Sequence, residues 1–129
     1  MSVFTHAELT YLQGERRLAR IATVAPDGTP HVCPVGMWKL DTAADVIEIS
    51  GLDFANTKKF RDVARTGRAA IVIDDLASTD PWRPRGIEIR GLAEAVHEPE
   101  PHIRLRPQRL VGWGLEDADG VGRRNARAV

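Results

Sequence analysis

The sequence is organised around residues 49–68, which read Ile49-Ser50-Gly51-Leu52-Asp53-Phe54-Ala55-Asn56-Thr57-Lys58-Lys59-Phe60-Arg61-Asp62-Val63-Ala64-Arg65-Thr66-Gly67-Arg68. This stretch predicts the end of a strand, a short loop and then a helix. Asn56 is a favourable N-cap, and Gly67 is a favourable residue to end the helix. Phe60, Val63 and Ala64 recur at helical spacing and would form the apolar face of that helix.

The charge at the start of this helix is unusual. A helix N-terminus favours Asp or Glu because the macrodipole is positive there, yet the first turn carries Thr57, Lys58 and Lys59. The chain has three lysines, and two of them are in this turn. Backbone N–H groups, a hydroxyl and two ammonium groups would together bind an anion, most naturally a phosphate. The alternative is a solvated basic turn in which Lys58 pairs with Asp62, four residues later.

Composition limits the classes of function. At 129 residues the chain is expected to form one domain, and its 18 basic and 18 acidic side chains give a formal net charge of zero. A balanced charge argues against a general nucleic-acid or anionic-membrane binder. One cysteine, Cys33, excludes an internal disulfide and fits a reducing compartment. We find neither a signal segment nor an apolar run approaching the ~20 residues that span a bilayer, so we expect a cytoplasmic protein.

Short alternating stretches on both sides of the helix predict strands. The turn Pro26-Asp27-Gly28 would join the first two into a hairpin. Residues 76–86 are punctuated by prolines and predict a loop. The expected strands are residues 18–24, 29–35, 46–50, 69–74, 87–96 and one or two within 103–113.

These elements together predict the fold class. Thr5 and Glu8 form a capping box that would begin a short helix over residues 6–13, and Gly91 predicts a bulge or bend within its strand. Six short strands with two short helices are typical of a small, mostly-β barrel. The domain would span residues 1–115, because the polar tail 116–129 predicts disorder.

Several residues are candidates for contact with a ligand. Trp82 and Trp113 have large planar side chains that favour ligand stacking or subunit contact, although each could instead close one end of the barrel. His31 and Cys33 share a strand face but lack a third ligand, so no metal site is expected. No pattern typical of a nucleophilic serine, zinc, P-loop or dinucleotide site is present. The sequence therefore predicts no catalytic side chain of its own and a bound cofactor that carries the chemistry.

Four stretches resemble the pyridoxamine-phosphate-oxidase-like split β-barrel family. Residues 20–32 are similar to its opening hairpin, and residues 57–59 to its Ser-Arg-Lys phosphate motif. Residues 103–113 resemble its C-terminal Arg-x-x-Pro…Trp segment. Residues 75–86 resemble the deazaflavin-dependent branch, in particular the subgroup related to the reductase of tetracycline biosynthesis. The C-terminal substrate motif of the true pyridoxamine-phosphate oxidases is missing, so that reaction is not expected.

The resemblance implies a six-stranded split β-barrel, similar to FMN-binding proteins, that forms a homodimer with two cofactor sites at the subunit interface. The family uses FMN or the deazaflavin coenzyme F-420, and both carry a phosphate and a tricyclic ring. The residues implied to bind the cofactor are His31, Val35, Ser50, Thr57, Lys58, Lys59 and Trp113.

The implied roles of these residues differ. The helix start would bind the phosphate, with Ser50 beside it. His31 takes the place of a family arginine, Val35 would back the ring through its main chain, and Trp113 would border the ring in the dimer. The residues expected on the substrate side are Trp82, Arg83 and Arg85.

The function expected from the resemblance is an oxidoreductase that uses coenzyme F-420 to transfer hydride to or from a small conjugated organic substrate. An FMN-dependent oxidoreductase of the same fold is the alternative. A third hypothesis, from a different class, is a carrier that binds a flavin or deazaflavin without turnover. Expected partners are a second copy of the chain and a small-molecule substrate, without nucleic acid or membrane.

Overall fold

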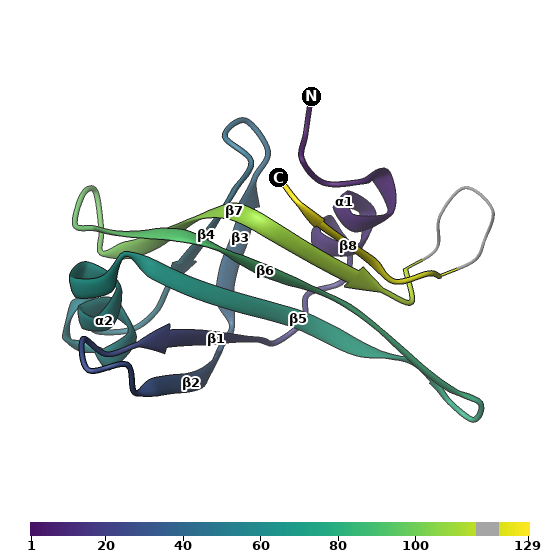
Figure 1. Ribbon diagram of the computed structural model, residues 1–129, viewed down its shortest axis with the longest axis horizontal. Helices are drawn as coiled ribbons and strands as arrows, with labels where there is room; N and C mark the ends of the chain where they lie inside the picture. Colours follow the sequence, from purple (N-terminus) through teal and green to yellow (C-terminus); the bar gives the residue numbers. More distant parts are fainter. Residues whose placement is uncertain (116–121) are drawn as a thin grey trace.

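The computed structural model describes residues 1–115 and 122–129 as a curled antiparallel sheet with short helices near its two ends (Figure 1). The helices are α1 (His6–Gln13), the 3-10 turn η1 (Phe54–Asn56) and α2 (Lys58–Thr66). The strands are β1 (Ala19–Val24), β2 (Pro30–Val35), β3 (Met37–Asp41), β4 (Val46–Ser50), β5 (Arg68–Thr79), β6 (Trp82–Val96), β7 (His102–Trp113) and β8 (Asn125–Ala128). The mostly-β class is confirmed, with eight strands where the sequence predicted six.

The two strands at the ends of the sheet are consecutive in the chain. The strand order is β2-β1-β5-β6-β7-β4-β3, with β8 added on β7. Only Gly36 separates β2 from β3, so the two ends of the sheet must meet, and the sheet curls into a split barrel. Arg16 holds this corner, because its guanidinium donates to the carbonyl oxygens of Gly36 and Trp38, each at 2.7 Å. The same guanidinium carbon lies 4.7 Å from the centroid of the Trp38 ring.

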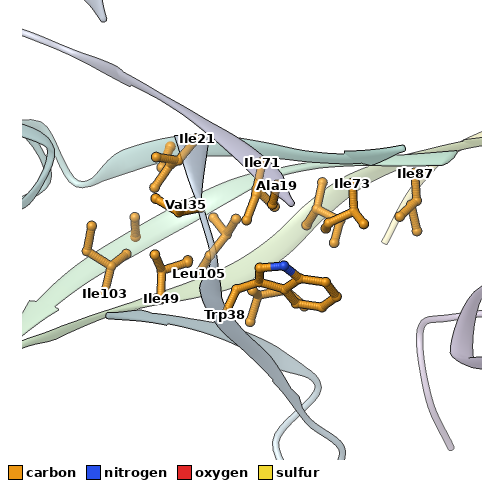
Figure 2. Packing of buried hydrophobic residues seen from close by; sticks show 14 of the residues in the cluster. Ala19, Ile21, Val35, Trp38, Ile49, Ile71, Ile73, Ile87, Ile103 and Leu105 are labelled. Atoms are coloured by element: carbon orange, nitrogen blue, oxygen red, sulfur yellow. The ribbon is translucent and has the colours of Figure 1, made fainter. Parts of the chain in front are cut away.

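The hydrophobic core lies inside the curl. Alternate residues of each strand point inward, including Ile21 on β1, Ile71 and Ile73 on β5, and Ile87 on β6, all at most 1% exposed (Figure 2). β-branched side chains pack well on a pleated surface. The alternation visible in the sequence therefore identifies the core face correctly.

The strand β3 and the far ends of β5 and β6 were missed by the sequence prediction. Residues 76–86 form a long two-stranded hairpin instead of a loop, broken only by a bulge between Leu76 and Ser78. Beyond Ile73 and Gly86 neither strand pairs with a further strand of the described chain, so Pro84 can lie in a strand without leaving a vacant place in a ladder. The hairpin extends past the barrel in Figure 1.

Three local signals were read correctly, and one cap was misplaced. The capping box of α1 is present, with Glu8 N to Thr5 Oγ1 at 3.1 Å and Thr5 N to Glu8 Oε1 at 2.8 Å. Gly67 ends α2 in the left-handed region, and the ladder shifts register at Gly91. The N-cap of α2 is Thr57, not Asn56, because Asn56 still belongs to η1.

The expectation of a disordered tail is wrong for Asn125–Ala128, which form β8 on the edge of β7. Polar composition predicted disorder, but β8 pairs through its main chain with the part of β7 that β4 does not reach, and such pairing does not depend on apolar side chains. Arg127 secures the strand, with Nη2 at 2.7 Å from Glu8 Oε1 and Nη1 at 3.0 Å from Glu8 Oε2. Residues 116–121 of the predicted tail lie outside the described residues. Within the described part of the chain, no helix is long and apolar enough to cross a membrane.

We predict that Arg127→Ala lowers the free energy of unfolding by about 2–4 kcal/mol, because the 2%-exposed Glu8 carboxylate would lose its charged partner. Urea unfolding followed by circular dichroism measures the change. Arg124→Ala, an exposed arginine just before β8, serves as the matched control and should cost less than ~0.5 kcal/mol. Equal stability of the two variants would mean that β8 does not hold α1.

Candidate functional site

The start of α2 is the first candidate site. The Thr57 hydroxyl donates to the Phe54 carbonyl oxygen at 2.7 Å and accepts from Phe60 N at 3.3 Å. Its single proton is therefore used within the cap, and the predicted role of Thr57 as a hydroxyl donor to a ligand is not supported by this geometry. The N–H groups of Lys58 and Lys59 have no partner within the helix, as at any helix start.

Lys58 is paired with a buried carboxylate. Its Nζ lies 3.0 and 3.1 Å from the two carboxylate oxygens of Asp62. Asp62 is 3% exposed and also accepts from Thr23 Oγ1 at 3.0 Å. Burial raises the pKa of Asp62, but the hydrogen bonds from Lys58 and Thr23 outweigh it and hold this pKa below its ordinary value. The Lys58–Asp62 ion pair, which was predicted as the alternative to an anion site, is thus present. Its carboxylate is buried, and the hydrogen bond from Thr23 to Asp62 joins α2 to β1.

Besides the exposed Arg61, whose Nε lies 3.4 Å from the Thr57 carbonyl oxygen, the cluster leaves Lys59 available. It is half-buried, and its Nζ lies 5.4 Å from the centroid of the Phe54 ring. Within the described residues it makes no ion pair with a carboxylate, in contrast to Lys58. A cation over an aromatic face keeps its charge and its hydrogen-bond donors. Lys59 can therefore donate to an anion.

The strand β2 carries two further predicted residues, and one of them, His31, lies toward this end of the barrel. His31 lies opposite Thr23 in the β1–β2 ladder, and its charge contributes to the low pKa of Asp62. Val35 is 6% exposed and packs in the core, so only its main chain can face a ligand. On the outer face, Val32 and Pro34 are exposed. His31 and α2 therefore belong to one cluster.

Ser50 lies in a hollow on the outer face of β3 and β4. The cavity has a volume of about 470 Å³, and Met37, Lys39, Glu48 and His102 are among the residues that line it. Lys39 pairs with Glu48 at 3.5 Å but is itself 73% exposed. The sequence prediction missed Lys39 because it missed β3. The alternation of Met37, Lys39 and Asp41 around the buried Trp38 was the signal that could have identified this strand.

A second polar cluster lies where the β5–β6 hairpin leaves the barrel. Arg85 donates two hydrogen bonds to the Asp75 carboxylate, from Nε to Oδ1 at 2.7 Å and from Nη2 to Oδ2 at 3.0 Å. The Tyr11 hydroxyl donates to Asp75 at 2.8 Å, and Arg17 Nε does so at 3.1 Å. The hydrogen bond from Arg85 holds the pKa of Asp75 far below its ordinary value, and burial raises the pKa of Tyr11. Arg85, expected on the substrate side, is therefore committed to this cluster.

The other two residues expected on the substrate side remain exposed. Trp82 is 68% exposed and borders a cavity of about 480 Å³ with Arg20, Asp74 and Pro84. Arg83 lines a different hollow, of about 640 Å³, beside Tyr11. The three substrate-side residues are thus neighbours on β6 but face two different hollows.

The predicted cofactor residues form two separate groups. Trp113 packs beside Gly86, where an added Cβ would lie 2.8 Å from its ring. The helix α2 contacts the opposite end of β6, where Phe60 meets His97 with ring centroids 5.2 Å apart. At ~3.3 Å per residue, Gly86 and Val96 are roughly 33 Å apart along the strand. One chain therefore does not bring Trp113 to the lysines of α2, and Figure 1 shows α2 and the C-terminal end of β7 at opposite ends of the sheet.

The curled sheet and the lysines of α2 define a split β-barrel protein with a local cationic site. The family model described as Pyridoxamine 5'-phosphate oxidase matches residues 5–128, and the chain belongs to that family. It is 40% identical over 122 residues to the 5a,11a-dehydrotetracycline/5a,11a-dehydrooxytetracycline reductase of Streptomyces rimosus subsp. rimosus, with 88% of this chain and 84% of the relative covered.

Two solved structures extend the comparison at the level of the fold. An F420 reductase superposes with a TM-score of 0.59 at 21% identity, with 78% of this chain and 94% of that chain covered. An FAD-binding protein from Mesorhizobium loti superposes with a TM-score of 0.63 at 16% identity, with 84% and 98% covered. At these identities the likeness concerns the fold alone.

We predict that Lys58→Ala lowers the free energy of unfolding by about 1–3 kcal/mol at pH 7, because Asp62 would keep its charge without its main partner; solvent around Lys58 limits the loss. The folded-state pKa of Asp62 is lowered, so the stability it contributes is present above the unfolded value near pH 4 and is lost as the pH falls. The difference between wild type and variant should therefore shrink below about pH 4.

Thermal unfolding between pH 3 and pH 7 measures this difference. Lys59→Ala, which removes a cation that has no carboxylate partner among the described residues, is the matched control and should change stability much less. A loss that is the same at every pH would mean that the Lys58–Asp62 pair is not its cause.

Proposed function

We propose that this protein is an oxidoreductase that uses coenzyme F-420 to transfer hydride to or from a small conjugated organic substrate. The observation that carries the proposal is the 40% identity to a reductase of 5a,11a-dehydrotetracycline across 88% of the chain. The structural likeness to an F420 reductase agrees with a deazaflavin but also extends to an FAD-binding protein. A flavin is therefore the alternative to F-420, and FMN is the flavin with which F-420 is compared.

The residues of the α2 end fit a phosphate-bearing cofactor. Lys59 and the N–H groups of the first turn offer donors to a phosphate, and Lys58 lies beside them. The hollow around Ser50 and the main chain of β2 and β3 are the surfaces on which a planar ring would lie. A bound deazaflavin supplies the hydride chemistry, and the chain's own residues bind and orient it.

We further propose that the working unit is a homodimer. The α2 lysines and Trp113 lie at opposite ends of one chain, so a site that contains both needs a second copy. Exposed apolar residues on neighbouring strands and the hairpin, among them Val32 and Leu76, would be covered by such a contact. The expected role of Trp113 beside the ring rests on this dimer.

We predict that light scattering at micromolar concentration gives about twice 14.2 kDa. Val32→Glu, on the outer face of β2, should shift the mass toward that of one chain because it places a charge in a contact between identical surfaces. Glu94→Lys, an exposed charge change on the outer face of β6, serves as the control. A monomeric wild type would contradict the dimer and the role of Trp113 together.

We predict turnover, which separates an enzyme from a carrier. Reduced F-420 bound to the protein should be oxidised by some members of a panel of conjugated enones and quinones in a stopped-flow instrument. Trp82→Ala should slow this oxidation while leaving cofactor affinity unchanged, because the tryptophan is far along the hairpin from the lysines of α2. Bound cofactor that stays reduced with every acceptor would favour the carrier.

A further inference from the structure

The two lysines of α2 do not offer two free charges. Asp62 neutralises Lys58 through two hydrogen bonds, and both carboxylate oxygens are buried against Thr23 and the ammonium. The carboxylate is ionised at neutral pH, since its pKa lies below the ordinary value. Two hydrogen bonds at 3.0 and 3.1 Å hold the opposite charges together, so the Lys58–Asp62 pair acts as a neutral unit with donors even though Lys58 is partly exposed.

The surrounding groups leave the site with about one positive charge. Lys59 and Arg61 carry two, of which Asp27 offsets one. Asp27, in the turn between β1 and β2, lies close enough for the charge of Lys58 to contribute to its lowered pKa, after the hydrogen bonds with Thr29. Asp27 is exposed, and its negative charge weakens the positive potential of the site. The Thr57 hydroxyl adds no donor because its proton is used by Phe54.

Resting on the proposed function, we propose that this site is built for a phosphodiester, which carries one negative charge, and that Asp62 sets the preference against a terminal phosphomonoester. A monoester carries close to two charges above its second pKa of about 6. Asp27 offsets one of the two charges of Lys59 and Arg61, so the second charge of a monoester would meet no net positive charge. A diester matches the single net positive charge of the site and still accepts from the backbone N–H groups.

This preference distinguishes the two candidate cofactors by their chemistry. FMN ends in a phosphomonoester. Coenzyme F-420 carries its phosphate as a diester between the ribityl chain and the rest of its side chain. The charge of the site therefore favours F-420 for a reason that is independent of the relatives.

The test compares FMN with its phosphate monomethyl ester, which has the same ring and chain but one charge less. Affinities are measured at pH 8 by quenching of flavin fluorescence, and F-420 is titrated in parallel. The wild type should bind the methyl ester more tightly than FMN. Asp62→Asn should shift the ratio of the two Kd values toward FMN by about tenfold, since it frees the charge of Lys58.

Asp27→Asn repeats the test without disturbing the core and should shift the ratio in the same direction by a smaller factor, so it decides the outcome if Asp62→Asn does not fold. Asp74→Asn, a carboxylate near the far hairpin, should leave the ratio unchanged. Tighter binding of FMN by the wild type, or no shift in folded Asp62→Asn or Asp27→Asn, would overturn this inference alone. Failure of F-420 and both flavins to bind would overturn the proposed function and this inference with it.

Discussion

The single residue between β2 and β3 closes the sheet into a barrel and so determines where the other elements lie. Gly36 joins the two ends of the strand order, so the sheet cannot remain open. Arg16 fixes the corner through the carbonyl groups on either side of Met37, and Trp38 Nε1 returns a hydrogen bond to the Arg17 carbonyl at 2.8 Å. At this corner the chain passes directly from β2 into β3. Ser50 and Lys39 line a hollow on the outer face of β3 and β4.

Three carboxylates join parts of the chain that are distant in sequence. Glu8 binds β8 through Arg127, Asp62 binds α2 to β1, and Asp75 gathers Tyr11, Arg17 and Arg85 at the base of the hairpin. Each has cationic and neutral donors that satisfy it, and no buried side-chain polar atom among the described residues lacks a partner. Such networks contribute less to stability than to a unique arrangement, because desolvation offsets much of the attraction.

The fold could be predicted from sequence wherever local signals agreed. Alternating isoleucines gave the core strands, and Gly67 gave the end of α2. The prolines at 81 and 84 misled because a two-stranded hairpin tolerates them, and β8 was missed because Arg127 finds its partner 119 residues away. At the site, the sequence identified the lysines of α2 and the possible pairing with Asp62. It could not show that Asp62 is buried, since that depends on Thr23 from another strand.

Under the proposed function, Lys59 at the start of α2 binds the phosphate of a deazaflavin cofactor. The most direct measurement is isothermal titration of F-420 into the wild type, Lys59→Ala and Arg65→Ala, the last removing an exposed cation from the other end of the same helix. The account predicts binding that is weaker by about tenfold or more in Lys59→Ala, from loss of a charge-assisted hydrogen bond, and unchanged in Arg65→Ala. Equal affinity of Lys59→Ala and wild type would contradict the account.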